Sequence, residues 1–343
     1  MKAVVFHEHG GIDKLKYEEA PKPAIGAGEV LVKVKACALN HLDIWVREGI
    51  PAYRIKLPHI SGSDVSGEVA ETAPDVKGFT AGQKVIVFPG VSCLHCPNCL
   101  AGLDNMCETY TILGAGIDGA YAEFVKVQSI NVIPMPERLT FEEASAFPLT
   151  FLTAWHMLIT RAGLKPGETA LILAAGSGIG SAAVQIAKLT GAKVIATVGD
   201  DTKIQKAKEL GADEVINYTK EDFSKRVKEL TKGKRVDVVF EHVGPVTWEK
   251  SILSLGKTGR LVICGSTTGP SVQIDLRYVF SRQLSIFGSM MGTHREFLEV
   301  VKLVGEKKLS PVVHAKFPLK EARAAQELML SRNYFGKIVL CPD

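Results

Sequence analysis

The stretch LILAAGSGIGSAA, residues 171–183, decides the fold of this chain. It predicts a buried strand, a tight glycine turn and the start of a helix, and a second apolar strand follows on schedule. Glycine lets the backbone approach a ligand closely, and the N–H groups at a helix N-terminus favour a pyrophosphate. The alternative is a glycine turn that only links strand to helix. The residues that we expect to bind a dinucleotide here are Gly176, Ser177, Gly178, Ile179 and Gly180.

The segment around this turn, residues 148–288, alternates apolar strands with helical patterns. Continuous Val, Ile and Leu strands between helices indicate a parallel sheet covered on both faces, so we predict a doubly wound α/β domain. The predicted strands are Thr169–Ala174, Lys193–Val198, Glu214–Asn217, Val236–Phe240, Arg260–Cys264 and Leu284–Phe287, and the predicted helices are Ile179–Thr190, Asp201–Leu210, Glu221–Thr231 and Thr247–Leu253.

The flanking segments have a different character. The first third contains short β-type runs punctuated by Gly and Pro, which is typical of a twisted, partly closed β-domain. The chain end carries two helical patterns and a last strand at Lys337–Leu340. We therefore expect residues 1–147 and 289–343 to form one β-rich domain, with residues 148–288 inserted as the dinucleotide domain.

Composition narrows the class of protein. At 343 residues the chain is long for one hydrophobic core, and its formal charge of +4 is spread among interleaved acidic and basic residues. This pattern argues against a nucleic-acid surface. The sequence start lacks the apolar core of a signal peptide, and no window approaches ~18 consecutive apolar residues. We expect a cytoplasmic enzyme that acts on a small molecule and does not bind a membrane.

Four cysteines are clustered in a lobe at about residues 90–110. Their spacing places four thiolates within one excursion of the chain, which favours a structural zinc with no open coordination position. Two disulfides or a redox dithiol are the alternatives, and His95 is expected to be a surface residue. The four predicted ligands are Cys93, Cys96, Cys99 and Cys107.

With this quartet and glycine turn, the chain resembles the medium-chain dehydrogenase/reductase family over essentially its whole length. Further phrases carry the resemblance: GEVLV at 28–32, GQKV at 82–85, GAYAEF at 119–124, TAW at 153–155, LGAD at 210–213 and GKIV at 336–339. The resemblance implies a Rossmann-type domain inserted into a GroES-like catalytic domain, and a ketone, enone, quinone or alcohol as substrate.

Zinc alcohol dehydrogenases of this family hold a second, catalytic zinc. Their ligands are a Cys three residues before an Asp, a His within Gly-His-Glu, and a Cys before the cofactor domain. Here Asn40 precedes Asp43, the triplet is Gly62-Ser63-Asp64, and no Cys stands near Pro148. The nearby Cys37 fits a strand position better than a ligand position. This pattern resembles the zinc-free quinone oxidoreductase branch, while a second zinc on some of Asp64, His41, His59 and His156 remains an alternative.

The second predicted strand bears on the choice of dinucleotide. NAD-selective folds usually end it with an acidic residue that binds the ribose, and Lys193–Val198 lacks one. Asp200 and Asp201 come late and are expected to cap the next helix, while Lys203 is placed to meet a 2′-phosphate. We therefore favour NADP(H), with NAD(H) as the alternative. The cofactor contacts that the resemblance implies are Thr153, Gly178, Ile179, Lys203, Tyr218, Gly244, Gly265 and Arg332.

Catalysis without a second zinc requires hydrogen-bond donors at the developing oxyanion. Asn40 is the candidate for polarising the carbonyl, His41 for supplying a proton through water, and Asp43 for orienting its neighbours. Capping of a turn by Asn40 and a phosphate contact by His41 are the alternatives. Three functions follow in order: a reductase without catalytic zinc, an alcohol dehydrogenase with an atypical zinc site, and a non-catalytic NADPH sensor. The resemblance also implies a homodimer or homotetramer that pairs the Leu284–Phe287 strand.

Overall fold

A computed structural model describes residues 1–51 and 53–342, so Ala52 and the last residue of the predicted 289–343 segment lie outside the description. The chain divides into two compact units. Unit 1 comprises Met1–Leu149 and Thr293–Asp343, and unit 2 comprises Thr150–Gly292. Among the described helices, none has both the length and the apolar character needed to cross a membrane.

Unit 2 is a parallel sheet with the strand order β13-β12-β11-β14-β15-β16. Numbered from β11, this is the 3-2-1-4-5-6 order of the Rossmann fold, so the predicted doubly wound sheet is confirmed. The central strands are buried on both faces, as β12 shows with five consecutive buried residues. The bounds are β11 (Thr169–Ile172), β12 (Lys193–Val198), β13 (Glu214–Asn217), β14 (Val236–Glu241), β15 (Leu255–Ile263) and β16 (Ser285–Gly288).

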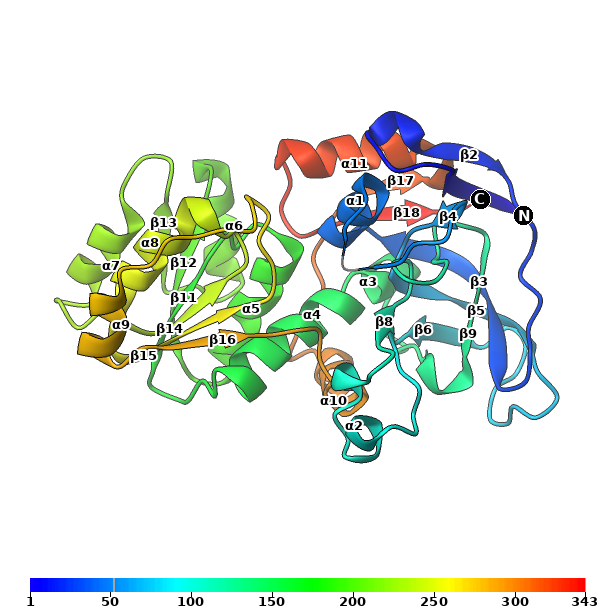
Figure 1. Ribbon diagram of the computed structural model, residues 1–343, viewed down its shortest axis with the longest axis horizontal. Coiled ribbons are helices and arrows are strands. Elements are labelled where there is room, and N and C mark those ends of the chain that lie inside the picture. Colours follow the sequence, from blue (N-terminus) through cyan, green and yellow to red (C-terminus); the bar gives the residue numbers. More distant parts are fainter. Residues whose placement is uncertain (52, 343) are drawn as a thin grey trace. The chain divides into compact units, whose positions relative to one another are not determined.

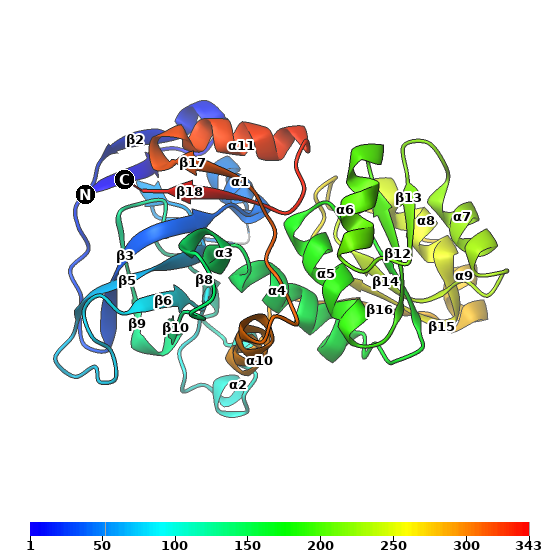
Figure 2. The same ribbon diagram turned by 180° about the vertical axis from the view of Figure 1, so that it is seen from behind.

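Helices cover both faces of this sheet (Figure 1). Figure 2 shows α5 and α6 against one face and α7, α8 and α9 against the other. Their apolar sides complete a core that includes Leu171, Val239 and Ile252. The helices of this part of the chain are α4 (Pro148–Trp155), the π-helical η4 (His156–Arg161), α5 (Gly178–Leu189), η5 (Asp201–Lys203), α6 (Ile204–Glu209), α7 (Phe223–Leu230), α8 (Pro245–Ser254) and α9 (Leu276–Arg282).

Unit 1 is built on a mixed sheet with the order β10-β6-β5-β3-β18-β17, in which β3 also pairs with β9. The long central strand β3 pairs with β18 from the chain end, and the N-terminal strands β1 and β2 form a separate sheet with β4, so both ends of the chain belong to this unit. The strands are β1 (Lys2–Phe6), β2 (Lys16–Glu19), β3 (Glu29–Ala38), β4 (His59–Ile60), β5 (Asp64–Thr72), β6 (Lys84–Val87), β7 (Gly90–Val91), β8 (Thr111–Ile112), β9 (Phe124–Gln128), β10 (Val132–Pro134), β17 (Val313–Pro318) and β18 (Lys337–Cys341).

Unit 1 also carries helices at its sheet ends and in its lobe. They are η1 (Ile12–Lys14), α1 (His41–Glu48), α2 (Pro97–Leu100), η2 (Asp104–Met106), η3 (Ser129–Asn131), α3 (Phe141–Ser145), α10 (His294–Gly305), η6 (Leu319–Glu321) and α11 (Ala322–Ser331). Cys37 lies inside β3 and is fully buried, in agreement with the predicted strand position. The α/β architecture that the sequence predicts, a Rossmann-type sheet inserted into a GroES-like β-rich domain, is thus observed.

Candidate functional site

The glycine turn lies at the carboxyl end of β11, where open α/β sheets bind their ligands. The backbone turns through Ala174, which has a positive φ of 48°. A Cβ at Gly180 would collide with the Ala174 carbonyl oxygen, so only glycine lets α5 begin this close to the strand. The Ser177 hydroxyl accepts a hydrogen bond from the Gly180 N–H at 3.0 Å and caps α5. This turn therefore fits a dinucleotide pyrophosphate at the start of α5.

The end of β12 carries no carboxylate, because Gly199 follows the strand. The next two acidic side chains are occupied locally. Asp200 accepts hydrogen bonds from the Thr202 N–H and hydroxyl at 2.8 and 2.6 Å and so caps η5. Asp201 accepts from Asn217 at 2.6 Å and pairs with Lys220. Asp200 thus caps the next helix as predicted, whereas Asp201 does not cap it and instead bonds residues that follow β13 or end it.

Other expected cofactor residues of unit 2 lie at the same carboxyl end of the sheet. Burial lowers the pKa of the Lys203 ammonium from its usual range. A side chain at Gly199 would crowd the Tyr218 hydroxyl, so this ring lies directly beside the end of β12. Gly244 begins α8 with a φ of 94°, and Gly265 follows β15.

Two further expected cofactor residues lie elsewhere. Thr153 is buried in α4, where its hydroxyl contacts the Met291 sulfur at 3.7 Å. Arg332 belongs to unit 1 and ends α11 in the left-handed conformation, with an exposed side chain.

The polar residues of the expected catalytic region meet at one end of the unit 1 sheet. The central strand β3 pairs with β5 through Ala38 and Asp64 and with β18 through Ala38 and Val339. Asn40, two residues beyond β3, thereby meets Asp64 and Lys337, the first residues of β5 and β18. The Lys337 Nζ donates to the Asn40 Oδ1 at 2.7 Å and to the Asp64 Oδ2 at 2.9 Å.

Asn40 and Asp64 are also bonded to each other. The Asn40 Nδ2 donates to the Asp64 Oδ2 at 2.9 Å, and the second carboxylate oxygen accepts the Leu149 N–H at 2.7 Å. The side chains of Asp64 and Lys337 are 0% and 4% exposed. We name Asn40, Asp64 and Lys337 the buried triad. It pairs a buried cation with a buried anion, and Asn40 bonds to both.

Asp43 forms a second layer beneath the buried triad. Its Oδ2 accepts the Asn40 N–H at 2.7 Å and the Tyr121 hydroxyl at 2.9 Å. Asn40 is thus the N-cap residue of α1, as one alternative predicted, but its carboxamide belongs to the triad. Burial raises the pKa of Asp43 to about 6, although the two donated hydrogen bonds oppose this shift. His41 opens α1, half-buried and edge-on to Trp45 at 5.0 Å.

The cysteine quartet forms a compact cluster in the lobe. The ligand atoms of Cys93, Cys96, Cys99 and Cys107 all lie within 4.8 Å of one another. Sulfur–sulfur distances of 3.6 and 4.0 Å bracket the roughly 3.8 Å expected for a zinc tetrahedron with Zn–S bonds of about 2.3 Å. The sulfurs also face N–H donors, such as that of Cys93 on Cys107 at 3.2 Å.

The thiols of the quartet differ in their electrostatics: burial and the neighbouring thiols raise the pKa of Cys99 to about 12, whereas hydrogen bonds lower the pKa of Cys96. Burial acts to raise the pKa of Cys107, but hydrogen bonds from Cys93 and Thr109 outweigh it and lower the pKa to about 6. His95 is exposed and its ring bonds the Cys93 carbonyl, so it is a surface residue as expected. The donor set therefore fits a closed, structural zinc site.

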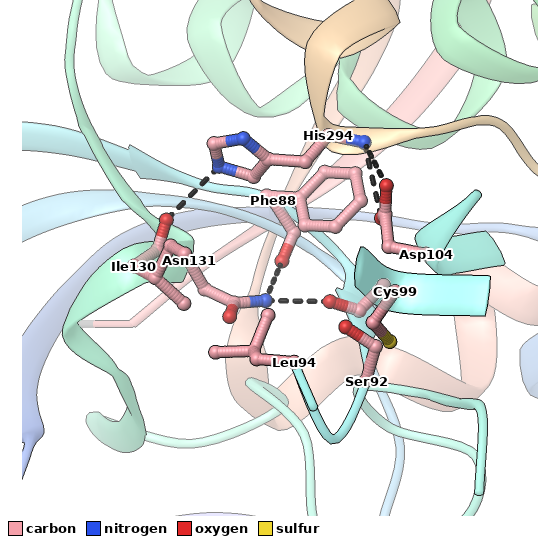
Figure 3. A pocket seen from close by; sticks show the side chains of 9 residues that line it. Phe88, Ser92, Leu94, Cys99, Asp104, Ile130, Asn131 and His294 are labelled. Carbon is pink, nitrogen blue, oxygen red and sulfur yellow. Dashed lines mark hydrogen bonds between the residues drawn. The ribbon is translucent and has the colours of Figure 1, made fainter. Parts of the chain in front are cut away.

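A small pocket opens beside this lobe (Figure 3). Its polar groups are already paired: Asn131 donates to the Phe88 and Gly90 carbonyls at 2.8 and 2.6 Å, and Asp104 accepts the His294 N–H at 3.1 Å. Burial raises the pKa of Asp104, which caps α10 from the lobe. These contacts anchor the zinc lobe to α10, so the pocket is a packing feature of the lobe.

Comparisons with known proteins agree with this geometry. Residues 26–137 match the family described as alcohol dehydrogenase GroES-like domain, and residues 178–306 match the family described as zinc-binding dehydrogenase. The alcohol dehydrogenase of Geobacillus stearothermophilus is 33% identical over 344 residues, which covers 100% of both chains. This chain belongs to the medium-chain dehydrogenase/reductase family.

Two other relatives show the breadth of this family. Quinone oxidoreductase 1 of Escherichia coli is 32% identical over 354 residues, covering 99% of each chain. A crystal structure described as an NAD-dependent alcohol dehydrogenase is 46% identical, with a TM-score of 0.96 and 99% of each chain covered. This medium-chain dehydrogenase/reductase is thus an NAD(P)-dependent oxidoreductase of the alcohol dehydrogenase superfamily.

The residues present do not fit the second zinc of zinc-type medium-chain dehydrogenases. At the three ligand positions stand the Asn40 carboxamide, the Ser63 hydroxyl and the Leu149 region, and none supplies a thiolate or an imidazole. Cys37 lies fully buried inside β3 and belongs to no cluster of candidate metal ligands among the described residues. His59 bonds the Gly114 carbonyl and Asp118 instead. Within residues 1–51 and 53–342, the quartet is the only cluster of three or more candidate metal ligands.

Two members of this site escaped the sequence analysis. Lys337 and Tyr121 appear in the sequence only as parts of the GKIV and GAYAEF phrases. Each contacts a predicted residue that is far away along the chain, at a separation of 297 residues for Lys337 and Asn40. The one signal in the sequence is a lysine at the first position of an apolar strand, because a lysine that is buried there needs a carboxylate partner. The sequence does not show which carboxylate that partner is.

Proposed function

We propose that this chain is an NADPH-preferring reductase of ketones, enones or quinones, acting by hydride transfer without a catalytic zinc. The observation that carries the proposal is the donor set at the end of β3. One amide, one hydroxyl and one carboxylate that is already bonded to Lys337 make a poor zinc site. They make a good hydrogen-bonding site.

When bound, a reduced nicotinamide supplies a hydride to an electrophilic carbon, and negative charge then collects on the substrate oxygen. We assign Asn40 to orienting that oxygen, since both ends of its carboxamide are held by the triad. His41, half-buried at the start of α1, relays a proton through water. Asp43 holds the Asn40 backbone in position through its 2.7 Å bond.

The preference for NADPH rests on the end of β12. Asp200 and Asp201 are both engaged in local hydrogen bonds, and we assign Lys203 and Tyr218, which follow β12 and β13, to the 2′-phosphate. The relative named an NAD-dependent alcohol dehydrogenase makes NADH the competing cofactor. Titration of both cofactors into the wild type and Lys203→Ala decides between them. We expect the substitution to weaken NADPH binding at least tenfold and to leave NADH binding nearly unchanged; equal losses would contradict a phosphate contact.

The edge strand β16 supports self-association. It ends the unit 2 sheet, and its Ile286 side chain is 41% exposed beside α9, where Leu276 and Phe280 are 66% and 70% exposed. An uncovered apolar sheet edge is a template for pairing with another chain. We propose a homodimer or homotetramer built on this edge, and Ile286→Lys should lower the mass measured by sedimentation. An unchanged mass would place the interface elsewhere.

Turnover separates the reductase from a non-catalytic NADPH sensor. The wild type should oxidise NADPH with at least one member of a panel of quinones, enones and ketones. Asn40→Ala should then lower kcat more than it weakens NADPH binding. If no member of the panel is reduced, the sensor is favoured; if kcat survives the Asn40 substitution, the orienting role is wrong.

A further inference from the structure

Lys337 places a positive charge beside Asn40, which stands at one of the three positions where the resemblance implies a ligand of the second zinc, and beside Asp64. Its Nζ lies 2.7 Å from Asn40 and 2.9 Å from Asp64, and its side chain is 4% exposed. Burying an ammonium is costly unless it is paired and hydrogen-bonded, and these two contacts satisfy that requirement. The fold therefore holds the buried Lys337 ammonium, paired with Asp64, against the predicted catalytic residue Asn40.

One N–H donor of the Lys337 ammonium has no acceptor among the described residues. A lysine ammonium has three N–H groups, and the described part of the chain offers acceptors to two of them, the Asn40 Oδ1 and the Asp64 Oδ2. One residue before Asp64, the buried Ser63 hydroxyl finds no hydrogen-bond partner among the described residues. Buried polar groups are normally satisfied, so both groups have capacity for a further ligand atom.

The charge balance of the cluster depends on Lys337. The two nearby carboxylates, Asp43 and Asp64, are both 0% exposed. Asp64 bonds the ammonium directly, and the positive charge of Lys337 also acts to lower the pKa of Asp43, against the larger effect of burial. Without this cation, the charged groups bonded to Asn40 would be two carboxylates.

Resting on the function proposed above, we propose that Lys337 is the positioning residue of the hydride step. It fixes the Asn40 carboxamide through Oδ1 and supplies a positive charge beside that carboxamide. In the reduction, the C–H bond at C4 of NADPH breaks, its electron pair forms the new C–H bond, and the substrate oxygen takes a proton from water. The Lys337 side chain transfers no proton in this step and stabilises the developing charge electrostatically.

The test must separate loss of the charge from loss of the fold. Lys337→Met alone leaves a buried, uncompensated Asp64, which is expected to be destabilising. The double variant D64N/K337M removes both charges and keeps similar shapes. Lys337→Arg keeps the charge, and Lys316→Met removes a 59% exposed lysine of the neighbouring strand β17 as the matched control.

We expect D64N/K337M to unfold at nearly the wild-type temperature and to bind NADPH within threefold of the wild type. Its kcat should fall at least 100-fold, the loss typical of removing one oxyanion-stabilising group. The primary isotope effect with 4-deuterated NADPH should rise, because the hydride step becomes rate-limiting. The kcat of Lys337→Arg should be at least tenfold higher than that of D64N/K337M. The kcat of Lys316→Met should equal that of the wild type.

Wild-type kcat in the folded double variant would overturn the role of Lys337 while leaving the reductase assignment intact. A kcat loss with an unchanged isotope effect and weakened NADPH binding would also overturn it, because that pattern marks a structural role. Absence of turnover in the wild type would contradict the reductase assignment and this inference together.

Discussion

Replacing Asp43 by asparagine should change how the free energy of unfolding of unit 1 depends on pH. Burial raises the pKa of Asp43 from its ordinary value of 3.8 to about 6. The folded state therefore holds this proton at pH values where the unfolded chain has released it, so the contribution of Asp43 to stability falls as pH rises from about 4 to about 6. At neutral pH the ionised Asp43 carboxylate lowers the free energy of unfolding by about 3 kcal/mol, because its folded-state pKa of about 6 lies above 3.8 and each unit of that difference is worth about 1.36 kcal/mol.

Roughly half of this cost, on the order of 1 kcal/mol, accumulates between pH 5 and 7.5, a range in which the cysteine quartet still holds its zinc. A carboxamide does not titrate, so the Asp43→Asn variant should gain about that much relative to wild type across the range, on top of a constant offset from altered capping. Guanidinium unfolding with excess zinc, followed by Trp45 fluorescence, measures this difference.

Tyr121→Phe serves as the companion variant to Asp43→Asn. Its lost hydroxyl donates to Asp43 at 2.9 Å and acts to lower the pKa of that carboxyl. The Phe variant should therefore raise the pKa further and steepen the fall of stability with pH. A wild type minus Asp43→Asn difference that stays flat from pH 5 to 7.5 would refute the burial argument.

Three further outcomes follow from local contacts. Ser177→Ala loses the 3.0 Å cap on α5 and should lower the free energy of unfolding by about 1 kcal/mol in chemical denaturation, whereas Ser177→Thr should restore it. Gly180→Val places a side chain against the Ala174 carbonyl and should abolish NADPH binding in a calorimetric titration; Gly305→Ala, where a Cβ meets open space, should bind normally. Cys107→Ser should release the zinc and lower the unfolding temperature by roughly 5 °C or more, with proteolysis concentrated in the lobe, before kcat changes. Normal cofactor binding by Gly180→Val or unaltered stability of Cys107→Ser would contradict these predictions.

The sheet of unit 2 was predictable because its strands are continuous apolar runs separated by helical patterns. Lys193–Val198 and Glu214–Asn217 are strands with the predicted bounds. The zinc lobe was equally accessible, since its ligands are close together in the sequence. Both features depend on residues that are close together in the sequence, so the sequence alone was enough to predict them.

Elements whose stability comes from tertiary contacts were missed. Helix α1 is eight residues long and begins at the catalytic candidates, where its capping carboxylate Asp43 is itself held by the distant Tyr121. Helix α9 buries none of its residues, so it has no apolar stripe to announce it. The buried triad depends on β5, β3 and β18 lying side by side, a pairing that no sequence spacing encodes.

The zinc content of the fully active enzyme tests the central claim most directly. Plasma emission spectroscopy on purified protein, paired with kcat for NADPH oxidation before and after mild chelation, gives zinc per chain and its relation to turnover. One zinc per chain is predicted, held by the quartet, with kcat retained for as long as the fold survives. Two zincs per chain, or a kcat that falls in step with loss of a second metal, would contradict hydride transfer without a catalytic zinc.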